Sequence, residues 1–171
     1  MAKLRKFKCY KTVKRPFTRF SKYRNKSYVR SRPVVRMSRH VTGKQKDYGA
    51  TVHLVSQQRI QIRDHAFESA RQATNRSLER NVGKGMYFFR IRTFPHHILR
   101  ENPLAKGAGA DRLSTGMSHA FGKCIGRAAQ IKEGQEMLTV QLDRAKVPEA
   151  RRALKLASYK LPCKCKVVVQ A

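Results

Sequence analysis

Apolar and polar residues alternate in several parts of the chain, and this alternation predicts β-strands. The clearest segment is 86–94 (MYFFRIRTF), where Phe89 and Ile91, followed by Thr93, fall on one face. Arg90 and Arg92 fall on the opposite face. Two arginines in a row on the polar face of a strand suit contact with a series of phosphates.

A second alternation occurs at 50–56 (ATVHLVS), where Val52 and Leu54 face one way and His53 and Val55 face the other. Three shorter strands follow the same principle. They are predicted at 127–131, at 136–143 after a turn containing Glu133 and Gly134, and at 165–170.

Two segments have helical periodicity instead. The first is 64–81, with Asp64 as the expected N-cap and Asn81 with Gly83 as the stop signal. The second is 147–161, with Pro148 near its first position and Pro162 beyond its end. Their expected inward faces are Ala66, Phe67, Ala70, Ala73, Thr74, Ser77 and Leu78 in the first helix and Ala150, Ala153, Leu154 and Ala157 in the second.

The order of these elements is strand, helix, strands, helix and strand, joined by short turns. This order predicts an α+β domain in which two helices pack on one face of a mostly antiparallel sheet. Charge suggests where the domain begins. Residues 1–46 contain 17 Lys and Arg and no acidic residue, whereas 47–171 contain 22 basic and 10 acidic residues. We therefore expect a basic N-terminal extension at 1–46 and a globular domain at 47–171.

The formal net charge of +29 indicates a polyanionic partner. A compact chain with this excess of positive charge repels itself unless a polyanion neutralises it, and nucleic acid is the expected polyanion. No apolar stretch approaches the roughly 20 residues of a spanning helix, and the charge is not confined to one amphipathic helix, so a membrane partner is disfavoured. In the extension, basic residues are interleaved with aromatic ones, which suits phosphate neutralisation together with stacking on exposed bases.

The four cysteines are expected to be small buried or half-buried thiols in a reducing cytoplasm. Cys163 and Cys165 have one residue between them, which does not match the paired spacing of a zinc site. The carboxylates, histidines and cysteines form no catalytic arrangement with a local orienting partner. We expect no catalytic residue, no metal and no cofactor.

The stretch GMSHAFGKC at 116–124 resembles a P-loop, but Gly116 and Gly122 are separated by five residues rather than four. In addition, Cys124 stands where the magnesium-binding hydroxyl belongs. It lies within a glycine-rich connection at 101–123. On the residues alone, this connection is equally compatible with an ordinary surface loop and with a mobile element that contacts RNA phosphates.

Three longer stretches resemble one family. QIRDHAFESARQATNRSL, RIRTFPHHILREN and KGAGADRLSTGMSHAFGKCIGRAAQIKEGQ are similar to the universal large-subunit ribosomal protein family L16, in its archaeal and eukaryotic branch L10e. KCYKTVKRPFTRFSKY and LPCKCKVVV are similar to the two ends of that branch, so the resemblance covers nearly the whole chain. The chain departs from the family pattern at 31–46, where it keeps Pro33 but lacks the acidic residue and most of the glycine. Its end at Ala171 favours an archaeal source.

The resemblance implies a two-layer α/β-hammerhead-like domain and a non-enzymatic role in the cytoplasmic ribosome. The implied partners are large-subunit rRNA of the 23S type, with 5S rRNA as an additional candidate, the acceptor end of tRNA, and neighbouring ribosomal proteins. No homo-oligomer is implied. The expected rRNA-binding residues are Arg15, Arg19, Arg24, Arg30, Arg32, Arg36, Arg59, Arg63, Lys84, Arg90, Arg92, Arg100, Lys123 and Arg127.

By the same resemblance, the loop from about 105 to 117 projects toward bound tRNA near the aminoacyl-tRNA site and the peptidyl-transferase centre. Its expected contact residues are Lys106, Gly107, Gly109, Asp111, Arg112 and Met117. Two other functions stay open on the residues alone. One is a nucleotide enzyme that uses Gly116 to Lys123, and the other is a general nucleic-acid-packaging protein.

Overall fold

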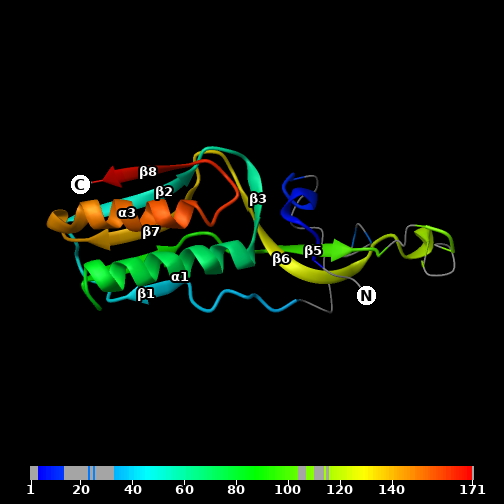
Figure 1. Cartoon of the computed structure of the whole chain (residues 1–171), viewed down its shortest axis with the longest axis horizontal. Helices are drawn as coiled ribbons and strands as arrows, with labels where there is room; N and C mark the ends of the chain where they lie inside the picture. Colours follow the sequence, from blue (N-terminus) through cyan, green and yellow to red (C-terminus); the bar gives the residue numbers. More distant parts are fainter. Residues whose placement is uncertain are drawn as a thin grey trace.

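The computed structural model describes residues 4–13, 23, 25, 33–103, 107–109, 114 and 116–170. It confirms the predicted α+β class, with antiparallel sheets and two α-helices (Figure 1). No helix in the described part of the chain is both long and apolar enough to span a membrane.

The larger sheet has five strands in the order β1-β4-β7-β2-β8, and each neighbouring pair is antiparallel. Four of these strands were predicted from alternation. The fifth, β1, was not predicted, because three residues are too few to show a period. The bounds are β1 (Val41–Gly43), β2 (Ala50–Ser56), β4 (Tyr87–Ile91), β7 (Glu136–Leu142) and β8 (Cys165–Gln170).

A second sheet of three antiparallel strands, in the order β3-β6-β5, extends away from the helices (Figure 1). The sequence predicted only part of β6 (Lys123–Ile131) and neither β3 (Ile60–Arg63) nor β5 (His97–Glu101). The IQIR segment of β3 does alternate apolar and polar residues, but four residues are too few to show a period. The predicted single sheet is therefore two sheets.

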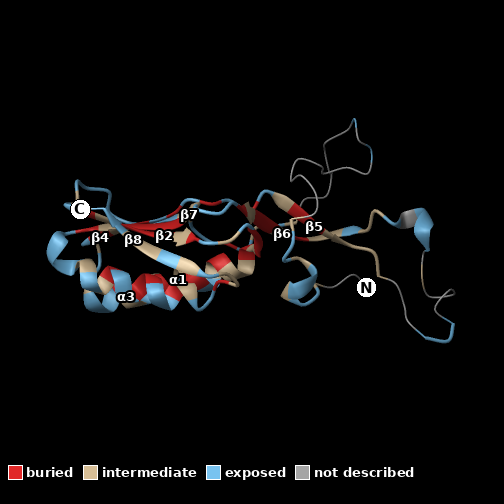
Figure 2. Cartoon of the chain, turned by 90° about the horizontal axis from the view of Figure 1, so that it is seen from above, coloured by how far each residue is buried: buried red, intermediate tan, exposed pale blue. Residues whose placement is uncertain are grey.

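Two helices, α1 (Asp64–Asn81) and α3 (Val147–Ser158), cover one face of the five-stranded sheet (Figure 2). The second predicted helix is confirmed as α3, since its four expected inward residues are all buried and Pro148 lies in the first turn, although it ends at Ser158 rather than at 161. In α1, Phe67, Ala70, Thr74 and Leu78 are buried as expected. Short 3-10 turns occur at η1 (Phe7–Cys9), η2 (Met117–His119) and η3 (Arg144–Lys146).

The core lies between the helices and the sheet. Phe67 and Leu78 from α1 and Leu154 from α3 are fully buried together with Leu54 of β2 and Val140 of β7. Each such side chain contributes about 1.5–3 kcal/mol through its removal from water. This layer of neutral side chains holds together a molecule whose surface charges repel one another.

The segment 33–43 also packs onto this body. Met37 is only 6% exposed and belongs to the core, and β1 pairs with β4. Some residues of the predicted basic extension thus contribute to the fold. The division of the chain between 46 and 47 stays a prediction.

Asp64 does not have the predicted capping role. The N-cap of α1 is Arg63, and Asp64 is the first helical residue, with its side chain 2% exposed. One carboxylate oxygen accepts the main-chain N–H of His65 at 2.9 Å, and the other accepts that of Arg36 at 3.0 Å. The carboxylate therefore anchors the preceding basic segment to the helix.

His53 lies on the opposite face of β2 from Val52 and Leu54, as the alternation predicts, and it is only 4% exposed. Its Nδ1 is 2.9 Å from Oγ1 of Thr139, and its Nε2 is 3.1 Å from Oε1 of Gln170. Alternation gave the correct side of the strand, but side chains of neighbouring strands cover that side.

Glu68 of α1 is a second anchor for the basic segment. It accepts hydrogen bonds from the main-chain N–H of Ser38 at 3.1 Å and from two guanidinium nitrogens of Arg71 at 2.8 and 3.0 Å. Hydrogen bonding from Arg71, helped by Gln72 and Ser38 and opposed by partial burial, lowers the pKa of Glu68 to about 2.

We expect Glu68→Gln to destabilise the protein by about 1 kcal/mol at pH 6, because the charged hydrogen bonds are lost. The folded-state pKa lies below the unfolded value, so this contribution is complete above pH 4.5 and disappears as the pH falls toward 2. Urea denaturation at several pH values measures it. Glu133→Gln, at an exposed turn, is the control, and equal stability of the two variants at pH 6 would contradict the anchoring role.

Candidate nucleic-acid interface

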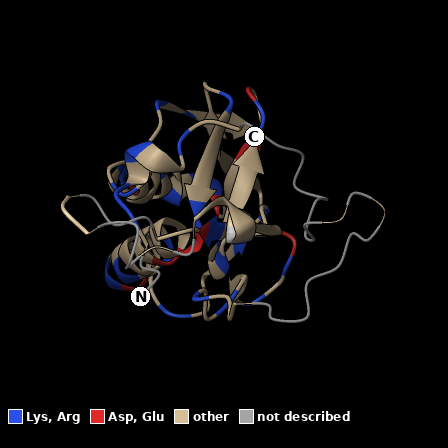
Figure 3. Ribbon diagram, turned by 90° about the vertical axis from the view of Figure 1, so that its right-hand side faces the viewer, with Lys and Arg blue, Asp and Glu red and all other residues tan. Residues whose placement is uncertain are grey.

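Lys and Arg lie on the helices, the strands and the loops (Figure 3). Several carboxylates already have basic partners within the chain: Glu68 binds Arg71, Glu101 binds Arg5, and Glu136 binds Arg92. Most basic side chains have no such partner among the described residues. Their positions define the surfaces that a polyanion can neutralise.

The first surface is the face of the five-stranded sheet opposite the helices. It contains an open hollow of about 680 Å³. Arg90 and Arg92 both line it, as their predicted shared face requires. Arg90 is exposed and has no carboxylate partner among the described residues, whereas Arg92 binds Glu136. Arg90 can therefore bind a phosphate without breaking an ion pair. Arg92 would have to release Glu136 before it could bind a phosphate.

An aromatic step borders this hollow. The rings of His40 and Phe94 are stacked, with their centroids 5.2 Å apart. The ring of His96 is tilted against Phe94, with a centroid distance of 4.6 Å. Burial lowers the pKa of His40, which favours a neutral ring. Phe94 is 39% exposed, so an unpaired base can stack on this step. This step was not predicted, although the run TFPHH at 93–97 is a signal for it in the sequence.

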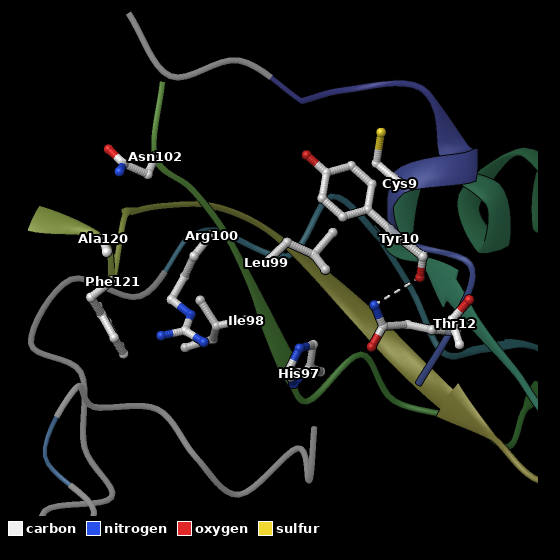
Figure 4. Close-up of a pocket in the computed structure, with 11 residues that line it drawn as sticks. Cys9, Tyr10, Thr12, His97, Ile98, Leu99, Arg100, Asn102, Ala120 and Phe121 are labelled. Atoms are coloured by element: carbon white, nitrogen blue, oxygen red, sulfur yellow. Dashed lines mark hydrogen bonds between the residues drawn. The ribbon is translucent and has the colours of Figure 1, made fainter. Parts of the chain in front are cut away.

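The second surface is the three-stranded sheet with the N-terminal segment that packs on it. Arg100 of β5 places its guanidinium carbon 3.8 Å from the ring centroid of Phe121. Tyr10 lies across a cleft of about 260 Å³ from these residues, and its carbonyl accepts a hydrogen bond from Gln61 at 3.0 Å (Figure 4). Arg100 is therefore half-buried and orientated within a cleft rather than free in solvent.

Two other predicted arginines bind the chain itself. Arg127 donates to the carbonyl of Pro33 at 2.7 Å, and Arg63 donates to the carbonyl of Arg5 at 3.0 Å. They hold basic segments against β6 and β3, a role that the sequence did not indicate. Besides Arg90 and Arg92, the exposed members of the predicted set are Arg36, Arg59, Lys84 and Lys123. Residues outside the described part of the chain are Arg15, Arg19, Arg24, Arg30, Arg32, Lys106, Asp111 and Arg112.

The third surface was not predicted at all. Arg76 and Arg80 of α1 and Arg152 of α3 line a groove of about 440 Å³ between the two helices, with Leu156 partly exposed in it. All three arginines are exposed and form no ion pair with a described carboxylate. Periodicity within one helix could not reveal this groove, because it cannot show that a second helix adds a cation beside Arg76 and Arg80.

The glycine-rich connection joins β5 to β6, and its residues 107–109, 116–118 and 120 are exposed. Gly107 and Gly109 have φ angles of 119° and 76°, and Met117 is 81% exposed. Lys123 begins strand β6. In a P-loop, the corresponding lysine starts a helix whose N–H groups face the phosphates. The described geometry is therefore incompatible with the nucleotide-site alternative.

The structure explains why position 122 is a glycine. Its φ is 78°, and a Cβ at this position would lie 2.6 Å from the carbonyl carbon of Glu101 and 2.8 Å from the nitrogen of Asn102. Only glycine permits both the left-handed backbone and this approach. The residue closes the base of the connection where the chain leaves β5 and enters β6.

The chain matches the family model "Ribosomal protein L16p/L10e" over residues 16–168. The chain belongs to the L16p/L10e family. It is 41% identical over 167 residues to "Large ribosomal subunit protein uL16" of Methanococcus aeolicus, covering 97% of this chain and 94% of the relative. The protein of the same name from Methanococcus maripaludis strain C7 is 43% identical with the same coverage. That of Archaeoglobus fulgidus is 38% identical, over 94% and 90% of the two chains.

These matches confirm the resemblance drawn from the sequence motifs. The L16p/L10e match spans both sheets, both helices and the glycine-rich connection. All three basic surfaces lie mainly on elements within it. The family consists of ribosomal proteins rather than enzymes, in agreement with the expected non-enzymatic role.

We expect Gly122→Ala to be markedly more destabilising than Gly134→Ala. Both glycines have a positive φ, 78° and 73°, so each substitution costs about 1 kcal/mol for the left-handed backbone. Only at Gly122 does the new methyl group meet main-chain atoms, since no atom lies within 4 Å at Gly134. Thermal or urea denaturation measures the difference, and equal losses would contradict the close approach at the base of the connection.

Proposed function

We propose that the chain is a structural constituent of the large subunit of the cytoplasmic ribosome, where it binds rRNA and neighbouring ribosomal proteins. The observation that carries this proposal is its membership of the L16p/L10e family over nearly its full length. The charge supports this proposal, because the chain has 39 basic residues and only 10 acidic ones. Several of those acidic residues already form ion pairs with arginines of the chain.

The three surfaces suit RNA in different ways. The α1–α3 groove offers three arginines to phosphates, and Arg guanidinium groups bind phosphates through two parallel hydrogen bonds. The hollow on the sheet adds Arg90 beside the stacking step of His40 and Phe94. Such a combination fits unpaired nucleotides, whose bases are free to stack. We infer that the groove binds RNA backbone and that the sheet face binds a segment containing unpaired bases.

The connection between β5 and β6 is proposed to approach the acceptor end of tRNA. Gly107, Gly109 and Gly116 have open space around them, and the exposed Met117 presents an apolar contact. This arrangement allows close approach of main chain to a ligand without steric conflict. Contact with 5S rRNA remains a further part of the proposal.

We expect Arg76→Gln, Arg80→Gln and Arg152→Gln, combined in one protein, to weaken binding to large-subunit rRNA and to reduce its salt dependence. Each phosphate contact contributes about 0.7–0.9 to the slope of log K against log salt, so the slope should fall by about 2–3. Filter binding between about 50 and 200 mM salt measures both quantities.

The matched control removes three charges elsewhere, with Lys46→Gln, Lys132→Gln and Lys146→Gln. These lysines are exposed and lie outside the groove. Equal losses in the two triple variants would show that binding depends on total charge and not on the groove. Sedimentation of the natural protein with chromosomal DNA instead of large ribosomal subunits would overturn the ribosomal assignment itself.

Deletion of residues 107–115 should leave rRNA binding intact while impairing tRNA-dependent steps of translation. The deletion spares Gly122, which closes the base of the connection, and the strands β5 and β6. Incorporation into large subunits and the rate of aminoacyl-tRNA accommodation are measured on the same particles. Loss of incorporation would show that the connection is structural, and unchanged accommodation would contradict the tRNA contact.

A further inference from the structure

Cys163 and Cys165 form a thiol pair that the ribosomal role does not explain. Their sulfur atoms are 3.5 Å apart, and the Sγ of Cys165 is also 3.5 Å from the carbonyl oxygen of Cys163. Cys163 lies in the turn after α3, and Cys165 is the first residue of β8. Both are only half-buried, so a small reagent can reach them.

The surroundings favour a thiolate at Cys163. A hydrogen bond from Cys165, helped by the hydroxyl of Ser56 and opposed by burial, lowers the pKa of Cys163 to about 7. The same interaction raises the pKa of Cys165, which therefore keeps its proton.

The other two cysteines lack this arrangement. Cys124 is half-buried on β6, and burial raises its pKa. Cys9 is exposed in η1. Among the residues that the structure describes, Cys9 and Cys124 can therefore serve as internal controls for the Cys163–Cys165 pair.

We infer that Cys163 and Cys165 are a redox-active dithiol, which a hydroperoxide converts into an intramolecular disulfide. The Cys163 thiolate attacks one peroxide oxygen, the O–O bond breaks, and a sulfenic acid and an alkoxide or hydroxide form. The sulfur of Cys165 then attacks the sulfenic sulfur. A disulfide forms, the S–O bond breaks, and the departing hydroxide takes the Cys165 proton to leave as water. The two thiols are oxidised by two electrons and the peroxide is reduced.

Disulfide formation has a mechanical consequence. The sulfurs must approach from 3.5 Å to about 2.05 Å, so the main chain between Cys163 and Cys165 must shift at Lys164. The carbonyl of Lys164 accepts the N–H of Gln57 at 3.0 Å, and β8 is an edge strand. We therefore expect oxidation to loosen the start of β8.

The experiment treats the full-length protein with a small excess of hydrogen peroxide at neutral pH, then blocks remaining thiols and maps the peptides. The expected product lacks two hydrogen atoms and has a disulfide linking Cys163 to Cys165, with Cys124 still free. Amide exchange of Gln57 should increase in this product. Oxidation of Cys124 at the same rate, or intermolecular disulfides through Cys9 as the main product, would overturn the inference.

Two variants separate the chemistry from structural damage. In Cys165→Ala, dimedone should trap the sulfenic acid at Cys163, and the pH midpoint of Cys163 alkylation should rise because the donated hydrogen bond is lost. Cys124→Ser should leave both the rate and the product unchanged. An unshifted midpoint in Cys165→Ala would show that the two thiols do not interact. None of these outcomes depends on whether the ribosomal proposal holds.

Discussion

Repulsion among the basic residues is the constraint on which the rest of the structure depends. The net charge of +29 opposes compaction, and the opposing contribution comes from neutral packing between the sheet and the two helices. Phe67, Leu54 and Leu154 are completely buried there. The few carboxylates serve a different purpose. Asp64, Glu68 and Glu101 bind N-terminal residues, so they attach the most basic part of the chain to the body.

This use of carboxylates leaves most of the described cations without a carboxylate partner, and the fold gathers several of them on separate surfaces. Arg76, Arg80 and Arg152 meet only because α1 and α3 lie beside each other on one face of the sheet. Arg90 lies on the opposite face, beside the stacked pair of His40 and Phe94. A protein with basic surfaces on opposite layers can contact two RNA segments at once, and each neutralised phosphate then also reduces the repulsion within the protein.

Local periodicity was sufficient where one element meets the core through one face. It correctly placed the buried side of β4 and all four inward residues of α3. It failed where structure depends on distant partners. The short strands β1 and β3 exist because β4 and β6 provide hydrogen bonds for them. His53 is buried by Thr139 and Gln170, which are 86 and 117 residues away in sequence. The helix groove and the internal roles of Arg63 and Arg127 are likewise products of tertiary contacts.

The P-loop-like stretch at 116–124 shows the same limit at a single residue. Glycine followed by lysine suggests phosphate binding when only neighbours in sequence are considered. In the fold, Gly122 is required by the main chain of Glu101 and Asn102, and Lys123 is the exposed first residue of a strand. The glycine is thus required by the close packing of main chain where β5 and β6 meet, while the lysine can contact a phosphate. Two adjacent residues that look like one nucleotide-binding motif therefore have separate physical causes, and only the lysine belongs to the proposed RNA-binding surface.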